Sequence, residues 1–210
     1  MPNTPDVALA GGGVRLDATF LYADLRHSTY LASNYQNRTA AKVIKCFIYC
    51  ATAIIKLNKG TVTSFDGDRV MGVFVGNEKN SQAAKAGLQI NWSVQNVVEP
   101  KVSAKFTSIK ESGFDLRHGV GIDTGSVLTV RAGVRGINDL IWIGRAPNLA
   151  AKFSDITDAG YSTFIHQDVY SRLAKDSRYT SQNVDMWESR SFKIDGTSIP
   201  IYRSGYRVEP

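Results

Sequence analysis

Apolar residues recur along this 210-residue chain with two periods, one typical of strands and one typical of helices. Residues 16–24 are rich in β-branched and aromatic residues and end on a carboxylate, which predicts a buried strand. Residues 30–58 contain neither glycine nor proline and place apolar positions at helical spacing, and Lys59-Gly60 is a helix stop signal. The first half is therefore expected to run strand 16–24, helix 30–58, strand 61–65, tight turn Asp66-Gly67-Asp68, strand 70–75 and helix 78–98.

The second half is predicted to begin with an exposed polar connection at 100–113. Alternating apolar residues then predict a strand that turns at Thr124-Gly125, and a later strand leads into a helix. The expected elements are strands 114–123, 127–130 and 140–143, helix 146–155, and short strands at 162–166, 183–188, 192–194 and 200–203. The order β-α-β-β-α-β followed by further strands predicts an α+β fold on the ferredoxin-like plan, with helices on one side of an antiparallel sheet.

Length and composition support one globular domain. Residues 1–13 contain two prolines and end on three glycines, which predicts a flexible lead-in before a single domain at 14–210. With 43% hydrophobic and 21% charged residues, wholesale disorder is excluded. Residues 46–55, the longest uncharged run in the first predicted helix, are about half of the ~20 residues that a membrane span needs. Because no signal-peptide pattern is present either, we expect a cytoplasmic protein without a membrane partner.

The formal net charge of +6 fits an anionic partner such as a nucleic acid or a nucleoside triphosphate. It fits equally well a basic surface that only keeps the protein soluble, so charge alone does not decide between them. The two cysteines, Cys46 and Cys50, are too few for a disulfide framework and have no nearby histidine to complete a metal site. We expect them to be small buried apolar side chains.

Two carboxylates stand out. Asp24 ends the first predicted strand, and Asp68 lies in the turn of the hairpin. In a β-α-β-β unit the first and third strands are neighbours, so both carboxylates are expected at one sheet edge. Such a pair, without a histidine cluster, favours Mg²⁺ or Mn²⁺. Each carboxylate also has a plain structural interpretation, as a strand-end turn former or part of an ordinary hairpin turn.

The residues after Asp24 read Leu-Arg-His-Ser-Thr and enter a helix. Backbone amides at a helix N-terminus bind phosphate, and Ser28 or Thr29 is expected to cap the helix. An ordinary cap without a ligand is the alternative.

The order of four segments resembles the class III nucleotidyl cyclases. Residues 23–29 resemble the first-metal motif of that family, F-x-D-I-x-G-F-T, and residues 64–74 resemble its second motif, G-D-x-x-M-x-V-F. Residues 117–127 are similar to the R-x-G-I-x-x-G-x-V segment, and residues 141–152 are similar to the signature V-I-G-x-x-V-N-x-A-A-R. Each match is weak alone, but the four occur in the family's order.

The resemblance implies a head-to-tail homodimer with two sites between the chains. Asp24, Asp68 and the backbone carbonyl of Leu25 would hold two divalent cations, Mn²⁺ or Mg²⁺, and the partner chain would supply Asn148 to position the ribose. The ribose 3′-oxygen would attack the α-phosphorus and expel pyrophosphate, giving a 3′,5′-cyclic nucleotide. The residues assigned to nucleotide binding are Arg26, His27, Ser28, Thr29, Ser64, Phe65, Ile141, Arg135 and Arg145; the two last-named arginines are also explained as surface residues.

Departures from the family pattern concern catalysis. Lys152 stands where the family has its transition-state arginine, and a lysine supplies charge without the planar guanidinium fork. His27-Ser28 replaces Gly-Phe in the phosphate loop. We expect His27 to form a wall or a surface rather than to act as a general base.

The base-reading positions also differ. Ser64 stands where adenine-using relatives carry lysine, and Ile141 stands where they carry aspartate or threonine. The acid and small polar residue of guanylyl cyclases are missing as well, and a purine edge left unpaired costs specificity. The chain thus resembles the pyrimidine cyclases of bacterial Pycsar antiphage defence, with UTP favoured over CTP. That resemblance implies an effector protein activated by the cyclic nucleotide.

Three other functions remain open at this point. A purine cyclase that reads its base through other residues is one, and a catalytically silent module for dimerisation or nucleotide sensing is another. Asp24, Asp68 and Asn148, which silent relatives usually lose, are all present. The third is an RNA-binding module, which needs exposed aromatic residues on the sheet. Because the strand carrying Phe20 and Tyr22 is predicted to be buried, we expect no nucleic-acid partner.

Overall fold

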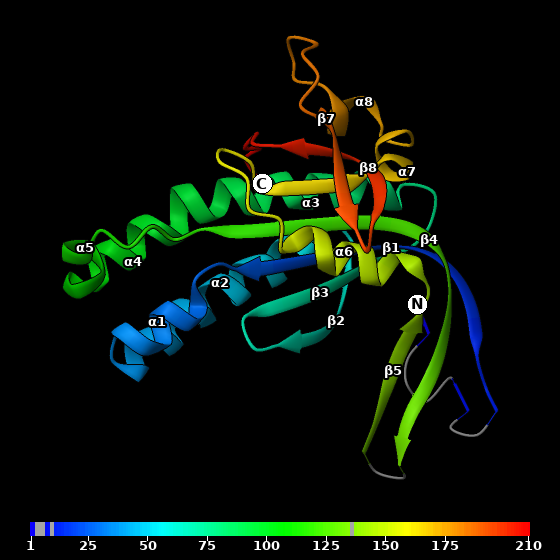
Figure 1. Ribbon diagram of the computed structural model, residues 1–210, viewed down its shortest axis with the longest axis horizontal. Helices are drawn as coiled ribbons and strands as arrows, with labels where there is room; N and C mark the ends of the chain where they lie inside the picture. The colour runs from blue at the N-terminus through cyan, green and yellow to red at the C-terminus, as the bar shows by residue number, and fades with distance from the viewer. Residues whose placement is uncertain (3–6, 9–10, 135–136) are drawn as a thin grey trace.

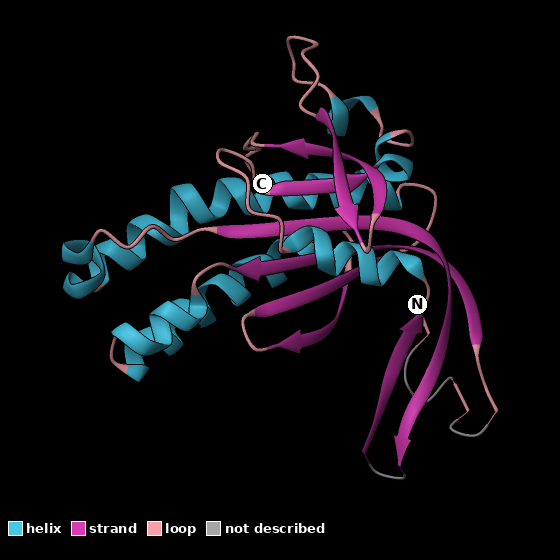
Figure 2. Cartoon of the chain, in the orientation of Figure 1, coloured by secondary structure: helices cyan, strands magenta, loops and turns pink. Residues whose placement is uncertain are grey.

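The computed structural model describes residues 1–2, 7–8, 11–134 and 137–210 (Figure 1). Over these residues the chain forms an eight-stranded sheet with helices packed against it, which confirms the predicted α+β class (Figure 2). Part of the predicted lead-in lies outside the described residues, and the first strand starts directly after it. The strands are β1 (Val14–Leu25), β2 (Thr61–Asp66), β3 (Arg69–Phe74), β4 (His118–Val134), β5 (Ile137–Ile143), β6 (Thr163–His166), β7 (Glu188–Ile194) and β8 (Thr197–Ser204).

The helices fall mainly between β1 and β2 and between β3 and β4. They are α1 (Ser28–Asn34), α2 (Asn37–Leu57), α3 (Lys79–Ser93), the π-helical segment η2 (Val94–Val98), α4 (Glu99–Lys105), α5 (Thr107–Ser112), α6 (Arg145–Ser154), α7 (Gln167–Tyr170) and α8 (Lys175–Arg178). None of the helices in the described ranges is long and apolar enough to cross a membrane.

The sheet has the strand order β2-β3-β1-β4-β6-β8-β7, and β5 pairs with the far end of β4. β1 pairs antiparallel with both β3 and β4, so the expectation that the first and third strands are neighbours is confirmed. β6 runs parallel to β4, which makes the sheet mixed and corrects the prediction of an antiparallel one. β5 and the end of β4 project from the body as a two-stranded arm (Figure 1).

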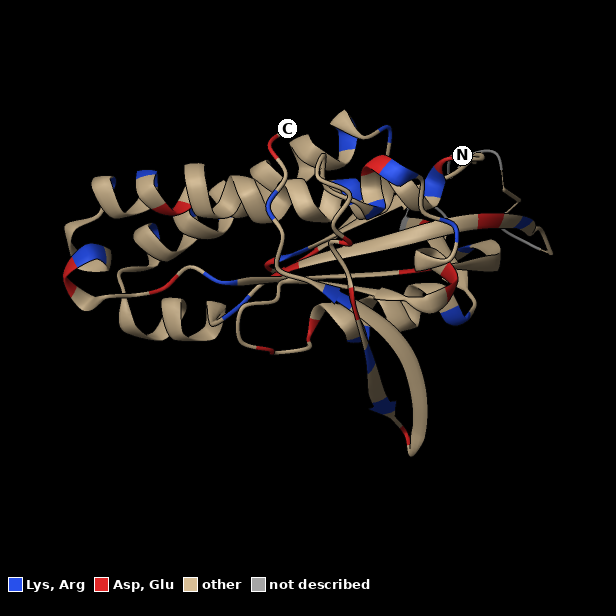
Figure 3. Ribbon diagram, turned by 90° about the horizontal axis from the view of Figure 1, so that it is seen from above, with Lys and Arg blue, Asp and Glu red and all other residues tan. Residues whose placement is uncertain are grey.

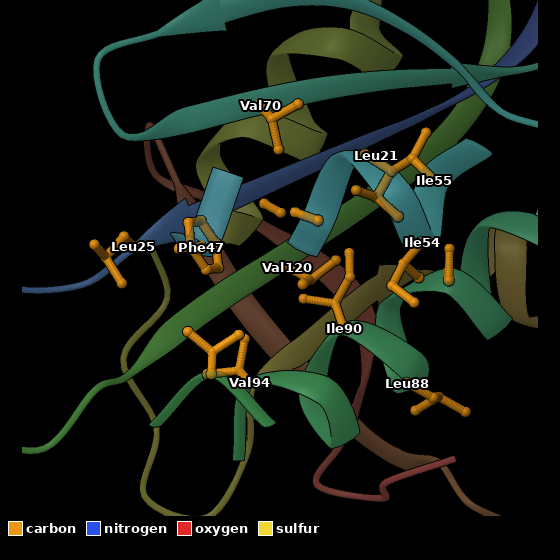
Figure 4. Close-up of a cluster of buried hydrophobic side chains, with 14 of the residues drawn as sticks. Leu21, Leu25, Phe47, Ile54, Ile55, Val70, Leu88, Ile90, Val94 and Val120 are labelled. Carbon is orange, nitrogen blue, oxygen red and sulfur yellow. The ribbon is translucent and has the colours of Figure 1, made fainter. Parts of the chain in front are cut away.

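Both faces of the sheet are covered. On one face Leu21 and Ala23 of β1 pack in the main core with α2 and α3 (Figure 4). On the other face Phe20 packs with Ala146 and Ala150 of α6. The prediction of helices on one side is therefore wrong, because β1 carries apolar side chains on both faces and each face must be shielded from water.

The predicted helix 30–58 is two helices. Tyr35 adopts an extended conformation that ends α1, and α2 starts two residues later. The ring of Tyr35 packs edge-on against Tyr30 and Phe114, so tertiary aromatic contacts favour the break. On α2 the cysteines also differ from expectation, because Cys46 is exposed and Cys50 is half-buried.

The predicted exposed connection at 100–113 is helical. The helical path continues from α3 through η2 into α4, where the extended residue Phe106 ends it, and α5 follows; Val102 of α4 and Ile109 of α5 are buried in the core. Pro100 lies within this continuous path, where it donates no backbone hydrogen bond, and the wider π-helical turn of η2 directly precedes it. The polar composition of this segment masked two buried positions at helical spacing.

β4 runs without a turn through Thr124 and Gly125, which pair with Thr19 and Ala18 of β1. The predicted turn at Thr124-Gly125 is therefore wrong. A Cβ atom on Gly121 would lie 2.0 Å from the carbonyl oxygen of Ala150, so this glycine admits the backbone of α6 against the strand. In the tail, the predicted strand 183–188 is wrong, because residues 183–187 form only an isolated bridge at Asp185 and Glu188 already begins β7.

Candidate active site

The two carboxylates predicted to converge do lie at one end of the sheet. Asp24 is the second-last residue of β1, and its register partner on β3 is Arg69, which directly follows Asp68. Both aspartates line a cavity of about 580 Å³ together with Leu25 and the turn residue Gly67. The pairing of the first and third strands thus joins positions 44 residues apart in the sequence.

Asp24 is mostly buried, with 19% of its side chain exposed, and it is paired with a cation of the protein itself. Nη2 of Arg69 lies 3.1 Å from Oδ2 of Asp24 and 2.6 Å from Oδ1 of Asp155. Burial raises the pKa of Asp24 above its ordinary value, Arg69 opposes this shift, and the nearby charges of Asp68 and Asp155 add to it. Aspartates outnumber arginines among the residues that line the cavity, and this excess of carboxylate groups favours binding of a cation.

The chain turns sharply between β1 and α1. His27 is the N-cap of α1 with φ 61°, a left-handed conformation, and its side chain makes no capping hydrogen bond. The family motif has glycine at this position, which this backbone conformation explains. Ser28 and Thr29 lie in the first turn of α1 and line the cavity, so the expectation that one of them is the cap is wrong.

Arg26 lines the cavity but uses its guanidinium within the protein. It donates to the hydroxyl of Thr157 at 2.6 Å, to the carbonyl of His118 at 3.2 Å and to the carbonyl of Ile156. Burial lowers the pKa of Arg26, and the charges of Asp24 and Asp155 oppose that shift. In this arrangement Arg26 fixes the loop after α6 as one wall of the cavity.

The donor set suits hard divalent cations. Asp24 and Asp68 converge in an open cavity that is lined by no thiol and by one imidazole, that of His27, whereas zinc sites usually combine several such ligands. Within the described part of the chain, no three His, Cys, Asp or Glu side chains cluster so as to hold a metal. Cations at Asp24 and Asp68 would therefore need further oxygen ligands, such as phosphates or water.

Asn148 and Lys152 are exposed on α6 and do not line the cavity. They are four residues apart and so share one side of the helix. Nζ of Lys152 lies 2.9 Å from Oδ2 of Asp195, an exposed ion pair. A single chain thus does not bring these two residues to Asp24 and Asp68.

The predicted base-reading residues lie on two separate strands. Ser64 is half-buried and Phe65 is 58% exposed on β2, whereas Ile141 is 45% exposed on β5 in the projecting arm. None of the three lines the cavity of Asp24 and Asp68. Arg135, predicted to bind the triphosphate, lies outside the described residues.

Arg145 opens α6 and is held by carboxylates. Its Nε lies 3.3 Å from Oδ2 of Asp123, and its Nη2 lies 2.8 Å from Oδ2 of Asp168. Asp123 is fully buried, and burial raises its pKa to about 7 although Arg145 opposes the shift. Nδ1 of His166 lies 3.5 Å from Oδ1 of Asp123. These contacts anchor the N-terminus of α6 to β4 and β6.

Besides the turn residues Asp66 and Gly67, sequence reasoning missed three residues that line the cavity. Arg69 was not predicted as a site residue although it follows Asp68 directly; the register of β1 against β3 places it opposite Asp24. Asp155 and Thr157 follow α6, and only tertiary packing brings them beside β1. Acidic and basic residues are interspersed over the elements (Figure 3), so neither composition nor charge patterning marks this cavity.

The chain is similar over its whole length to proteins named uridylate cyclase. It is 44% identical to the one from Rhodovulum sp. strain MB263 in an alignment that covers all of this chain and 88% of that protein. It is 41% identical to the one from Xanthomonas perforans, over 98% of this chain and 87% of that protein. No protein-family model matches the chain.

Solved structures of cyclases share the fold. The guanylyl cyclase Cya2 superimposes with a TM-score of 0.77 at 21% identity, covering 95% of this chain and 96% of that one. The adenylyl cyclase CyaB from P. aeruginosa superimposes with a TM-score of 0.75 at 22% identity, covering 91% and 95% of the two chains. At this identity the likeness establishes the fold alone.

Proposed function

The chain belongs to the uridylate cyclase family of nucleotidyl cyclases, and on this premise we propose that it converts UTP to 3′,5′-cyclic UMP and pyrophosphate. The membership makes it a phosphorus–oxygen lyase of the class III cyclase fold. The strand order β2-β3-β1-β4 and its helical connections fit the ferredoxin-like plan. Relatives named for uridylate, together with Ser64 and Ile141 at positions where purine-reading side chains are expected, support the pyrimidine.

One observation carries the assignment of the site. Asp24 and Asp68 open into the same 580 Å³ cavity, beside the first turn of α1. Paired oxygen ligands next to free helix amides suit a metal-bound triphosphate. We assign Asp24, Asp68 and the carbonyl of Leu25 as ligands of two divalent cations, Mn²⁺ or Mg²⁺. When bound, such cations neutralise the triphosphate and increase the acidity of the ribose 3′-hydroxyl.

The remaining work falls to side chains that bind and orient the substrate. Ser28 and Thr29 line the cavity from the first turn of α1, and we assign their backbone amides and hydroxyls to the phosphate oxygens. Arg26 keeps the loop at Thr157 closed against β1, which preserves the shape of the cavity. In-line attack of the 3′-oxygen on the α-phosphorus needs the ribose held in one orientation. That role is assigned to Asn148, and Lys152 supplies positive charge to the transition state.

Because Asn148 and Lys152 are exposed away from the cavity of their own chain, the site requires a second copy. The projecting arm fits such an association, since Val134, Ile141 and Ile143 expose 66%, 45% and 54% of their surface on it. Exposed apolar residues of this size mark association surfaces. A head-to-tail homodimer would place α6 of each chain over the Asp24–Asp68 cavity of the other and form two equal sites.

Resemblance to the pyrimidine cyclases of antiphage defence extends the proposal to cellular function. Cyclic UMP would act as a second messenger that activates an effector protein on infection. In cells that carry the cyclase with its effector, Asp68→Ala is expected to abolish protection against phage in a plaque assay.

Product analysis tests the proposed reaction. The purified chain is incubated with Mn²⁺ and each of ATP, GTP, CTP and UTP, alone and mixed, and the products are identified by mass spectrometry. Cyclic UMP is expected to dominate. Cyclic CMP would correct the base, and cyclic AMP or cyclic GMP would overturn the interpretation of Ser64 and Ile141. Absence of any cyclic product would contradict turnover by the isolated protein.

A further inference from the structure

A second concave surface lies on the outer side of α2, away from the sheet. Its walls are α2 on one side and α3, η2 and α4 on the other, and its volume is about 940 Å³. Apolar side chains dominate the lining, among them Tyr49, Ala53, Trp92 and Val97. We call this surface the α2 groove. It shares no lining residue with the cavity of Asp24 and Asp68.

α2 carries more apolar surface than its contact with the sheet requires. Val43, Phe47 and Ala51 are buried in the core, as expected for the inner stripe of a surface helix. A second apolar stripe on α2 includes Cys46 and Tyr49 and lines the groove. Tyr49 is 78% exposed, although its ring is large and mainly apolar. A contiguous exposed stripe of this kind marks an interaction site rather than an ordinary surface.

Positive charge frames this apolar surface from both walls. Lys42 and Lys45 line it from α2, and Lys101 and Lys105 line it from α4. No aspartate or glutamate is among its lining residues, and the sequence of α2 contains neither. Across the described residues these four lysines make no salt bridge, whereas other lysines such as Lys79 and Lys152 do. The groove therefore presents unneutralised charge that carboxylates of a partner can pair with.

The shape selects the kind of partner. The α2 wall from Lys42 to Ala53 spans three turns of helix, ~17 Å at ~1.5 Å per residue. A trough of this length between two helices accepts one further helix, whose apolar residues at i, i+3, i+4 and i+7 fill it. A membrane surface fits less well, because it binds apolar residues on a projecting face rather than in a concavity.

We propose that the α2 groove is a docking surface for an amphipathic helix of a partner protein that carries carboxylates on both sides of its apolar stripe. The apolar stripe packs on Tyr49 and Trp92, and the carboxylates pair with lysines of both walls. Because the groove is separate from the Asp24–Asp68 cavity, the proposal stands or fails independently of the proposed function.

Binding of two matched peptides to the full chain tests the proposal. The probe is a fluorescein-labelled peptide of about 14 residues, or ~21 Å of helix, with leucine along one face and glutamate on both flanks. The reference peptide has lysine in place of every glutamate. Fluorescence anisotropy is expected to show saturable binding of the glutamate peptide, weakened by salt, and no binding of the lysine peptide. Equal binding of both peptides, or none of either, overturns the proposal.

Variants locate the binding on the protein. Tyr49→Asp and Lys101→Glu are each expected to lower the affinity for the glutamate peptide by about tenfold, which is ~1.4 kcal/mol. Lys56→Glu is the matched control, because Lys56 is exposed on the same helix but does not line the groove. An unchanged far-ultraviolet circular dichroism spectrum and an unchanged unfolding temperature for all three variants show that they are folded. Binding that survives Tyr49→Asp places the peptide elsewhere and contradicts the proposal.

A sedimentation experiment with the same variants distinguishes a membrane from a protein partner. Vesicles of phosphatidylcholine with phosphatidylserine are mixed with the protein and sedimented. The protein is expected to stay in the supernatant. Co-sedimentation that is lost on Tyr49→Asp would assign the groove to anionic lipid and overturn the protein-partner proposal.

Discussion

At the scale of single residues, the charges around Asp24 bear on how the site accepts a cation. The guanidinium of Arg69 contacts Oδ2 of Asp24, an oxygen that a divalent cation would also bind. Both side chains are partly exposed, so the pair contributes only about 1 kcal/mol. A metal must nevertheless displace this positive charge or bind beside it.

Arg69→Gln is therefore expected to raise the affinity of the nucleotide-free protein for Mn²⁺. The expected gain is about fivefold, ~1 kcal/mol, measured by the electron paramagnetic resonance signal of free Mn²⁺ during titration. Asp68→Asn serves as the opposite control and should weaken binding. Arg117→Gln controls for loss of a nearby arginine, since Arg117 pairs with Asp115 instead. Unchanged or weaker Mn²⁺ binding by Arg69→Gln would show that the guanidinium does not compete with the cation.

Asp123 makes stability depend on pH. Its carboxyl is fully buried, and burial raises its pKa from 3.8 to about 7 in the folded chain. The groups facing it are Arg145, the buried His166, whose pKa is lowered by burial, and Asp168 through Arg145. Between these pKa values the folded state binds a proton that the unfolded state has lost. Stability should therefore fall as pH rises from about 4 to 7 and then level off.

Asp123→Asn removes this titration and keeps the shape of the side chain. Chemical denaturation at several pH values should show the variant gaining stability relative to the parent as pH rises to 7, by up to ~4 kcal/mol. Asp168→Asn is the control, because Asp168 is exposed and the Arg145 hydrogen bond holds its pKa below its ordinary value. That variant should keep the slope between pH 4 and 7. Parallel curves for the parent and Asp123→Asn would show that Asp123 is ionised when folded.

At the scale of elements, the position of α6 depends on glycines of β4. A Cβ atom on Gly121 would lie 2.0 Å from the Ala150 oxygen and 2.4 Å from the Ser154 nitrogen, both backbone atoms of α6. Gly121→Ala must push α6 from the sheet, and we expect a loss of about 2–3 kcal/mol in the free energy of unfolding. The rate of cyclic nucleotide formation should fall even under conditions in which the variant stays folded, because α6 carries Asn148.

Gly125→Ala is the matched control on the same strand. The nearest atom to a Cβ at Gly125 is the Cβ of Ala146, 3.9 Å away, which is an ordinary contact. Urea denaturation and product formation should both remain close to those of the parent. If Gly121→Ala is equally harmless, the close approach of α6 to β4 does not position Asn148.

The same elements show what local pattern can and cannot predict. The β2–β3 hairpin was predicted nearly to the residue, because its alternation and the Asp66-Gly67 turn are local signals. The break at Tyr35 was missed, because Tyr35 leaves the helix to pack against Phe114, 79 positions away. Gly125 was interpreted as a turn, since sequence alone does not distinguish a glycine that bends the chain from one that lies within a continuous strand.

The site divides in a similar way. Asp24 and Asp68 were predicted to converge from the β-α-β-β order alone, because that order determines which strands are neighbours. Asp155 was not foreseen, since its place beside Arg69 depends on how the loop after α6 folds back. The two apolar faces of β1 indicate that an element must cover the second face of the sheet, as α6 does. The register of α6 against β4 could not be predicted from the sequence.

At the scale of the whole molecule, the separation of the assigned residues limits what one chain can do. The residues assigned as metal ligands, Asp24, Leu25 and Asp68, line one cavity, and Asn148 and Lys152 are exposed on α6 outside it. Exposed apolar residues of the β4–β5 arm support association of two chains. Asp68→Ala and Asn148→Ala should each abolish turnover without altering the oligomeric state, because Asp68 is half-buried in a turn and Asn148 is exposed.

Mixing these two inactive variants tests shared sites directly. Random exchange of subunits yields one half heterodimers, each with one site that takes Asp68 from one chain and Asn148 from the other, both intact. Since such a heterodimer has one working site of two, an equimolar mixture should regain about a quarter of the parental rate of product formation. Co-expression with two different affinity tags isolates the heterodimer, which should then show about half of that rate. A mixture without activity, despite confirmed subunit exchange, would mean that Asp68 and Asn148 act within one chain and that α6 must move to reach its own cavity.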